Sequence, residues 1–178
     1  MIHINILVYF QNYYYSIVNG YSKLLYFSDF RHFKETGKSI TGLNYLAWQK
    51  GPAPKDLWLE MKSPKDDFRE FFTLLPVEEN SDRLNIIPRM KFNDRHLSKR
   101  EVRIIKDVAF MFKEATASQM VDVTHLVNDP WDATIREKGK NALIDYVLSF
   151  DDTPESLTLK EYQEKHEERQ EAKEALGE

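Results

Sequence analysis

The stretch Lys23-Leu24-Leu25-Tyr26-Phe27-Ser28-Asp29-Phe30-Arg31-His32-Phe33-Lys34 predicts a helix in the first quarter of the chain. Leu24 and Phe27 recur at one-turn spacing, and Phe30 lies one turn further on. Gly37 follows as a stop signal, because glycine accepts the left-handed backbone with which many helices end. We therefore expect a helix over residues 23–34.

Three capping boxes predict further helix starts. In each, a Ser or Thr precedes a Glu or Gln by three residues, so that side chains and backbone amides of the first turn can pair reciprocally. The boxes are Ser98–Glu101, Thr116–Gln119 and Thr158–Glu161. After the first box an apolar stripe marks a buried helix face, with Val102, Ile105, Val108, Ala109 and Phe112.

Prolines indicate other boundaries. Ser63-Pro64 and Asp129-Pro130 are each typical of a cap followed by a first-turn proline, and Pro54 is expected to open a helix to about Met61. Gly51-Pro52-Ala53-Pro54 itself is predicted to be a rigid irregular loop, because each proline fixes its own backbone and restrains the residue before it.

Short extended segments complete the expected fold. Tyr45–Trp48 is predicted as one, and the apolar runs 71–77 and 84–90 are predicted as a hairpin. Together these patterns favour a mainly α (α+β) fold. We expect a single compact helical domain with a small antiparallel β hairpin and a charged C-terminal helix.

Composition excludes several classes of protein. The 178 residues include no cysteine, which removes disulfides, cysteine–zinc sites and thiol nucleophiles and suits a reducing cytosol. The net charge of −4 equals that of residues 155–178 alone, which hold eight acidic and four basic residues. The remaining body is neutral and offers little clustering beyond Lys99-Arg100, so we do not expect direct nucleic-acid binding.

The first 20 residues contain no Asp, Glu, Lys or Arg. Residues 1–10 resemble a signal-peptide core, but they lack a basic flank and are too short to span a bilayer. A buried first helix or strand is the favoured interpretation, and no membrane role is expected.

Chemistry-bearing patterns are sparse. The five histidines form no metal-binding spacing, and no phosphate loop or nucleophile elbow is present, so no cofactor or metal is expected. Asp29 and His32 are three residues apart and share a helix face; with His125 they could shuttle protons, but a local hydrogen bond that orients the histidine is favoured. Trp48 with Gly51–Pro54 is either a stiff anchor for a protein partner or a structural loop.

The sequence resembles the Panacea domain of the SocA-like antitoxin family. The resemblance rests on residues 23–33 and on a series of later segments in register, over roughly residues 23–150. These segments are Thr36-Gly37, Ile40-Thr41-Gly42, Tyr45, Gly51–Pro54, Leu97-Ser98 with Glu101, residues 118–125 and Pro130-Trp131. It implies a mainly helical protein without a cofactor that neutralises a toxin encoded beside it. The uncharged segment 1–20 and the tail after Phe150 depart from the family pattern.

These observations lead to one working prediction. Residues 1–150 are expected to form the Panacea domain and residues 151–178 an acidic helical tail. The chain is expected to be a cytoplasmic, non-enzymatic antitoxin of a bacterial or phage toxin–antitoxin system that binds its toxin directly. The candidate partner-binding residues are Tyr26, Asp29, His32, Tyr45, Trp48, Pro52, Pro54 and Trp131.

Three alternatives stay open. The chain could be a proteolytic adaptor that delivers a toxin to a cellular protease, with the tail engaging the protease machinery. It could be an enzyme that uses Asp29, His32 and His125, or a phage-associated binding protein without a toxin.

Overall fold

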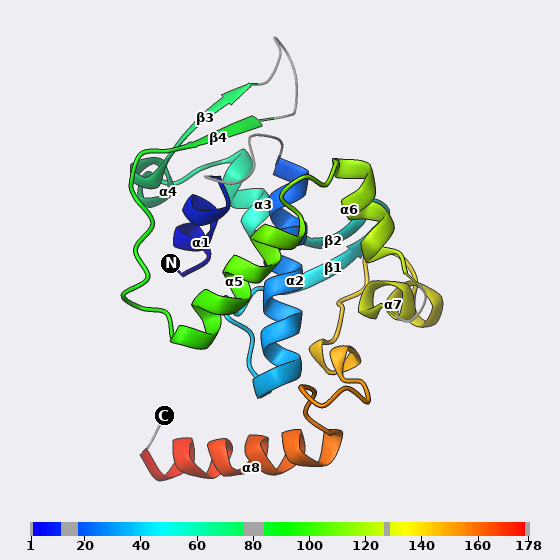
Figure 1. Ribbon diagram of the computed structural model, residues 1–178. Coiled ribbons are helices and arrows are strands. Elements are labelled where there is room, and N and C mark those ends of the chain that lie inside the picture. Colours follow the sequence, from blue (N-terminus) through cyan, green and yellow to red (C-terminus); the bar gives the residue numbers. More distant parts are fainter. Residues whose placement is uncertain (1, 12–17, 77–83, 127–128, 177–178) are drawn as a thin grey trace.

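Helix α2, Val18–Thr36, runs through the middle of the protein (Figure 1). The computed structural model describes residues 2–11, 18–76, 84–126 and 129–176. Side chains on several faces of α2 are buried, because other elements enclose it. These neighbours are α1 (Ile2–Gln11), α5 (Lys99–Met111), α6 (Ala117–Thr124), strand β2 (Gly51–Pro54) and the 3₁₀ helix η1 (Tyr146–Ser149). The helix predicted over 23–34 is confirmed and extends beyond both ends.

The apolar N-terminal segment is a helix packed into the body. In α1, Ile4 and residues 6–10 are buried, which confirms the prediction of a buried first element. The Tyr13–Tyr15 run lies outside the described residues. Among the helices that the structure describes, none is both long and apolar enough to cross a membrane.

The prediction of an irregular loop at Gly51–Pro54 is wrong, because this segment is strand β2, antiparallel to β1 (Tyr45–Trp48). Ala47 exchanges backbone hydrogen bonds with the segment 141–142, so residues 45 and 47 face that segment and residues 46 and 48 face β2. In β2 the partner of Leu46 is Ala53, and the partner of Trp48 is Gly51. Pro52 and Pro54 therefore occupy the positions that point away from β1, where a missing N–H removes no ladder bond.

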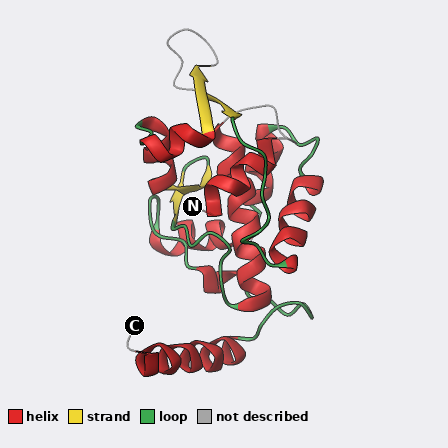
Figure 2. Cartoon of the chain, turned by 90° about the vertical axis from the view of Figure 1, so that its left-hand side faces the viewer, coloured by secondary structure: helices red, strands yellow, loops and turns green. Residues whose placement is uncertain are grey.

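A second hairpin projects from one end of the molecule (Figure 2). Strands β3 (Phe72–Pro76) and β4 (Leu84–Pro88) are antiparallel, as predicted, although the described residues form two such pairs rather than one. Before them lie α3 (Lys55–Lys62), which starts directly after Pro54, and α4 (Asp66–Phe71). The predicted Ser63 cap of α4 is wrong: Lys65 is the N-cap and makes no side-chain cap bond.

The capping predictions for the later helices are confirmed. Ser98 and Thr116 form complete capping boxes at the starts of α5 and α6. Asp129 caps α7 (Pro130–Lys138) by accepting a hydrogen bond from the backbone N–H of Trp131. In α5 the buried face includes Ile104 as well as most of the predicted stripe, while Val102 is half-buried.

Helix α8, Leu159–Leu176, lies outside the helical body in both views (Figures 1 and 2). The predicted charged C-terminal helix is confirmed, and none of its side chains is buried. Its docking contacts involve Tyr162, whose ring centroid lies 5.3 Å from that of Phe33, and Arg169. The Arg169 guanidinium donates to the backbone carbonyls of Gly37 and Thr36 at 3.1 and 3.2 Å, at the end of α2.

Candidate functional site

A buried carboxylate on α2 organises the segment that follows this helix. Asp29 is 0% exposed, and its Oδ1 accepts hydrogen bonds from the backbone N–H groups of Ile40 and Thr41 at 2.9 and 2.8 Å. Its Oδ2 accepts from the Tyr45 hydroxyl at 2.7 Å and from the Thr41 hydroxyl. Burial raises the pKa of the Asp29 carboxyl, and these hydrogen bonds oppose the rise. Because its acceptor sites are occupied, Asp29 serves to fix β1 against α2.

His32 does not pair with Asp29. Its Nδ1 lies 2.7 Å from the carbonyl oxygen of Lys38, so this nitrogen is the donor. His125 instead stacks on Trp131, with ring centroids 3.8 Å apart. A local hydrogen bond therefore orients His32, as favoured from the sequence, and its partner is the Lys38 carbonyl rather than Asp29. The set of Asp29, His32 and His125 is also not joined as a proton-transfer chain.

Two long-range hydrogen bonds tie α7 to the rest of the molecule. The Tyr26 hydroxyl donates to Asp129 Oδ1 at 2.8 Å, which joins α2 to the start of α7. The Trp131 indole N–H donates to the carbonyl of Trp48 at 2.9 Å, which joins α7 to β1. Burial raises the pKa of Tyr26, and it raises the pKa of Asp129 to about 6. The candidate residues of α2, β1 and α7 thus belong to one connected framework.

Most of the candidate partner-binding residues form this framework rather than exposed surface. Tyr26, Asp29, His32, Tyr45, Pro52, Pro54 and Trp131 are buried, and Trp48 is half-buried with its ring packed edge-on against Trp58 at 5.4 Å. Partner binding by these residues stays a prediction. Their burial means that they would act mainly through the surfaces that they hold in place.

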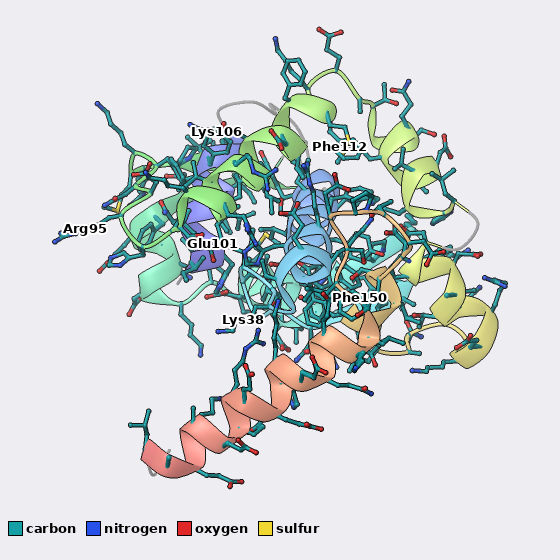
Figure 3. All side chains as sticks on the ribbon, turned by 60° about the horizontal axis from the view of Figure 1, so that its bottom comes forward. Lys38, Arg95, Glu101, Lys106, Phe112 and Phe150 are labelled. Carbon is teal, nitrogen blue, oxygen red and sulfur yellow. The ribbon has the colours of Figure 1, made fainter. Side chains whose placement is uncertain are left out.

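One such surface is a pocket of about 320 Å³, which we call the aromatic pocket. Helix α2 forms one wall, and the start of α7 with the chain at the end of η1 forms the other. Phe150, labelled in Figure 3, lies close to the end of α2, with its ring 5.5 Å from that of Phe33. The lining residues are Tyr26, Phe27, Phe30, Arg31, Lys34, Asp129, Pro130, Leu148, Ser149, Phe150 and Asp151.

Ion pairs surround the mouth of the aromatic pocket. Lys34 Nζ lies 2.5 Å from Asp151 Oδ2, and this contact helps to hold the pKa of the Asp151 carboxyl below its usual value. Arg31 lies 3.0 Å from Asp107 of α5. The pocket therefore has aromatic walls and a charged rim, which is the composition of a protein-binding anchor site.

A larger pocket of about 610 Å³ lies beside α1, lined in part by Ile2, Met90 and His96. None of the candidate partner-binding residues lines it. We therefore take the aromatic pocket, which Tyr26 lines and the buried framework supports, as the candidate site.

Sequence reasoning missed most of this pocket. Arg31 and Lys34 were seen only as part of a helix, and Asp129 only as a cap. The signal that pairs Tyr26 with Asp129 is absent from local patterns, because the two residues are 103 positions apart. In the part of the chain that the structure describes, no group of three or more His, Asp or Glu side chains could hold a metal ion.

A comparison with protein families places the geometry in context. The family model described as "Antitoxin SocA-like, Panacea domain" matches residues 22–132, which is more than half of the chain. Neither the curated proteins nor the solved structures compared with the chain include a match. The matched range begins inside α2, contains β1, β2, α5 and α6, and ends within the first turn of α7.

Proposed function

Because the chain belongs to the family of SocA-like antitoxins with a Panacea domain, we propose that it neutralises a cognate toxin by direct protein–protein binding. The toxin is expected to be encoded beside it, in a bacterial or phage toxin–antitoxin system of the cytoplasm. The protein acts by occupying the toxin and catalyses no reaction of its own. The family match is the observation that carries this proposal.

The aromatic pocket supports the proposal as a place where a toxin side chain can be anchored. Aromatic side chains provide much contact area and lose little conformational entropy on binding. The hydrogen bonds from Tyr26 to Asp129 and from Trp131 to Trp48 hold both walls in the free protein. A preformed wall lowers the entropic cost of association. Leu148 and Ser149, at the end of η1, are half-buried and stay accessible to a partner.

The first experiment measures growth of cells that express the neighbouring open reading frame, with and without this protein. If the neighbour arrests growth and the chain restores it, the antitoxin function stands. If the neighbour is harmless, or its toxicity is unchanged, the function fails for this pair. A pull-down of purified proteins then tests direct binding.

A matched pair of variants tests the pocket within the same assay. Ser149→Trp places an indole in the aromatic pocket, whereas Ser63→Trp makes the same change at an exposed position between α3 and α4. We expect Ser149→Trp to lose rescue of growth and Ser63→Trp to retain it, with both chains folded by circular dichroism. Equal rescue by both would remove the pocket from the binding surface.

A proteolytic adaptor is the alternative function. It is favoured by α8, which lies outside the body with no buried side chain, so most of its surface is accessible to a second protein. Under this alternative, purified protein binds the toxin without inhibiting it, and the toxin disappears only in cells that contain the protease. Inhibition by the purified protein alone would exclude the need for an adaptor.

A further inference from the structure

The aromatic pocket has a charged group, the carboxylate of Asp129, that no cation of the described residues neutralises. Its two basic residues are engaged elsewhere: Arg31 lies 3.0 Å from Asp107, and Lys34 lies 2.5 Å from Asp151. By contrast, no Lys, Arg or His of the described chain lies within ion-pair distance of the Asp129 carboxylate. The charge that the pocket leaves uncompensated is therefore negative.

The two oxygens of Asp129 differ in their surroundings. Oδ1 accepts both hydrogen bonds, from the Tyr26 hydroxyl at 2.8 Å and from the Trp131 backbone N–H at 3.0 Å. No described residue donates to Oδ2. The side chain is half-buried and lines the pocket, so a donor that enters the pocket can approach the carboxylate. Because Tyr26 and the cap bond fix the carboxyl group, Oδ2 is presented in one orientation.

The walls of the pocket suit the stem and head of a long basic side chain. The rings of Tyr26, Phe27, Phe30 and Phe150 line it, and the faces of aromatic rings attract a cation, more strongly where water is excluded. A volume of about 320 Å³ is at the lower end for a ligand site, which fits one side chain better than a cofactor. Arginine is preferred over lysine, because its planar guanidinium stacks on rings and is more weakly hydrated.

We propose that the aromatic pocket binds an arginine side chain of the toxin, with the guanidinium donating to Asp129 Oδ2 and its stem along Phe27 and Phe30. This inference rests on the proposed function and adds the chemistry by which the partner is recognised. An acidic side chain in the same position would meet both Asp129 and Asp151. A neutral apolar one would leave Oδ2 desolvated without a partner.

The pH dependence of binding follows from the groups around Asp129. Burial raises the pKa of this carboxyl to about 6; the Trp131 N–H and the Tyr26 hydroxyl oppose the rise, and Asp132 adds to it. Burial lowers the pKa of His125, which stacks on Trp131, and the charge of Lys23 adds to this shift. The other charged groups that line the pocket are Arg31, Lys34 and Asp151. Since only ionised Asp129 forms the ion pair, arginine affinity should fall about tenfold between about pH 7 and about pH 5.

The test uses the full chain and two small probes, N-acetyl-arginine amide and its neutral analogue N-acetyl-citrulline amide. Binding is followed by NMR, through the backbone amide of Trp131 and the carboxyl carbon of Asp129. We expect the arginine probe to shift both signals and to lower the pKa of Asp129, and the citrulline probe to do neither. Equal binding of both probes, or binding of neither, overturns the inference without any variant.

A variant pair gives a second measurement. Asp129→Asn keeps an N-cap oxygen and an acceptor for Tyr26 but removes the charge, so it is expected to fold. Asp122→Asn makes the same change at an exposed position of α6 outside the pocket. We expect Asp129→Asn to bind the arginine probe at least tenfold more weakly and Asp122→Asn to bind it as the unmodified chain does. Equal binding by both variants overturns the inference.

The growth assay separates this inference from the proposed function. If the unmodified chain rescues growth and binds no arginine probe, the pocket chemistry is wrong and the antitoxin function stands. If the chain binds the arginine probe through Asp129 but fails to rescue growth, the function fails for that neighbour and the arginine site stands.

Discussion

Replacing Tyr45 with Phe is expected to destabilise the protein by removing one of the four donors to Asp29. The hydroxyl of Tyr45 lies 2.7 Å from Asp29 Oδ2, and both side chains are 0% exposed, so water cannot take its place. A hydrogen bond to a charged group contributes about 1.5–3 kcal/mol to the free energy of unfolding. For a domain of this size, that loss lowers the melting temperature by about 4–10 °C.

The assay is urea unfolding followed by circular dichroism, with Tyr162→Phe as the matched control. Tyr162 is half-exposed on α8, and its hydroxyl makes no hydrogen bond with a described residue, so its loss should cost less than about 0.5 kcal/mol. The backbone and ring contacts of Tyr45 are kept in the variant, which isolates the hydroxyl. If the two variants unfold at the same urea concentration, the Asp29 framework does not have the stabilising role that we assign to it.

Three further predictions address α8 and the pocket. Gly37→Ala should loosen α8, because a Cβ at this position would lie 2.9 Å from Tyr162 Cδ2. Gly42→Ala is the control, since Gly42 has a similarly positive φ but a Cβ there would meet nothing within 4 Å. We expect faster tryptic cleavage of α8 in Gly37→Ala alone, and equal cleavage of both variants would contradict the docking. Deleting residues 170–178 should change the free energy of unfolding by less than about 0.5 kcal/mol, because residues 170–176 are exposed. A larger loss of this free energy in urea unfolding would mean that the end of α8 packs on the body. The unmodified chain should lose stability relative to Asp129→Asn as the pH rises from about 4 to about 6. The reason is that the folded-state pKa of Asp129, about 6, lies above the unfolded value, so the folded protein binds the proton more tightly. Parallel pH profiles of the urea midpoints of the two proteins would refute this.

Features that depend on neighbouring residues were predictable from the sequence. The capping boxes at Ser98 and Thr116 are set by residues three positions apart, and both form as expected. The helix over 23–34 and the hairpin of β3 and β4 follow from apolar periodicity in the same way.

The errors arose where the outcome depends on a distant partner. Whether Pro52 and Pro54 are compatible with a strand depends on which edge of β2 faces β1, and the position of the segment 141–144 beside β1 decides this. Asp29 was predicted beside His32 because they share a helix face, but the donors on residues 40, 41 and 45 satisfy it first. The aromatic pocket likewise exists only when Asp129 is brought to Tyr26.

The contact between α8 and α2 has an electrostatic side. The last carbonyls of α2 are the negative end of its macrodipole, and the cation that faces them is Arg169, 132 residues after Gly37. Added salt should screen this contact, so the tail is held more tightly in dilute buffer than in concentrated buffer. A ligand that binds better when α8 is docked strengthens the contact between Arg169 and α2, and a ligand that binds Arg169 itself weakens it. The docked contact changes the affinity for the ligand by the same factor as the ligand changes the docking equilibrium. Binding at α8 is in this way thermodynamically linked to the end of the helix from which Lys34 reaches the aromatic pocket.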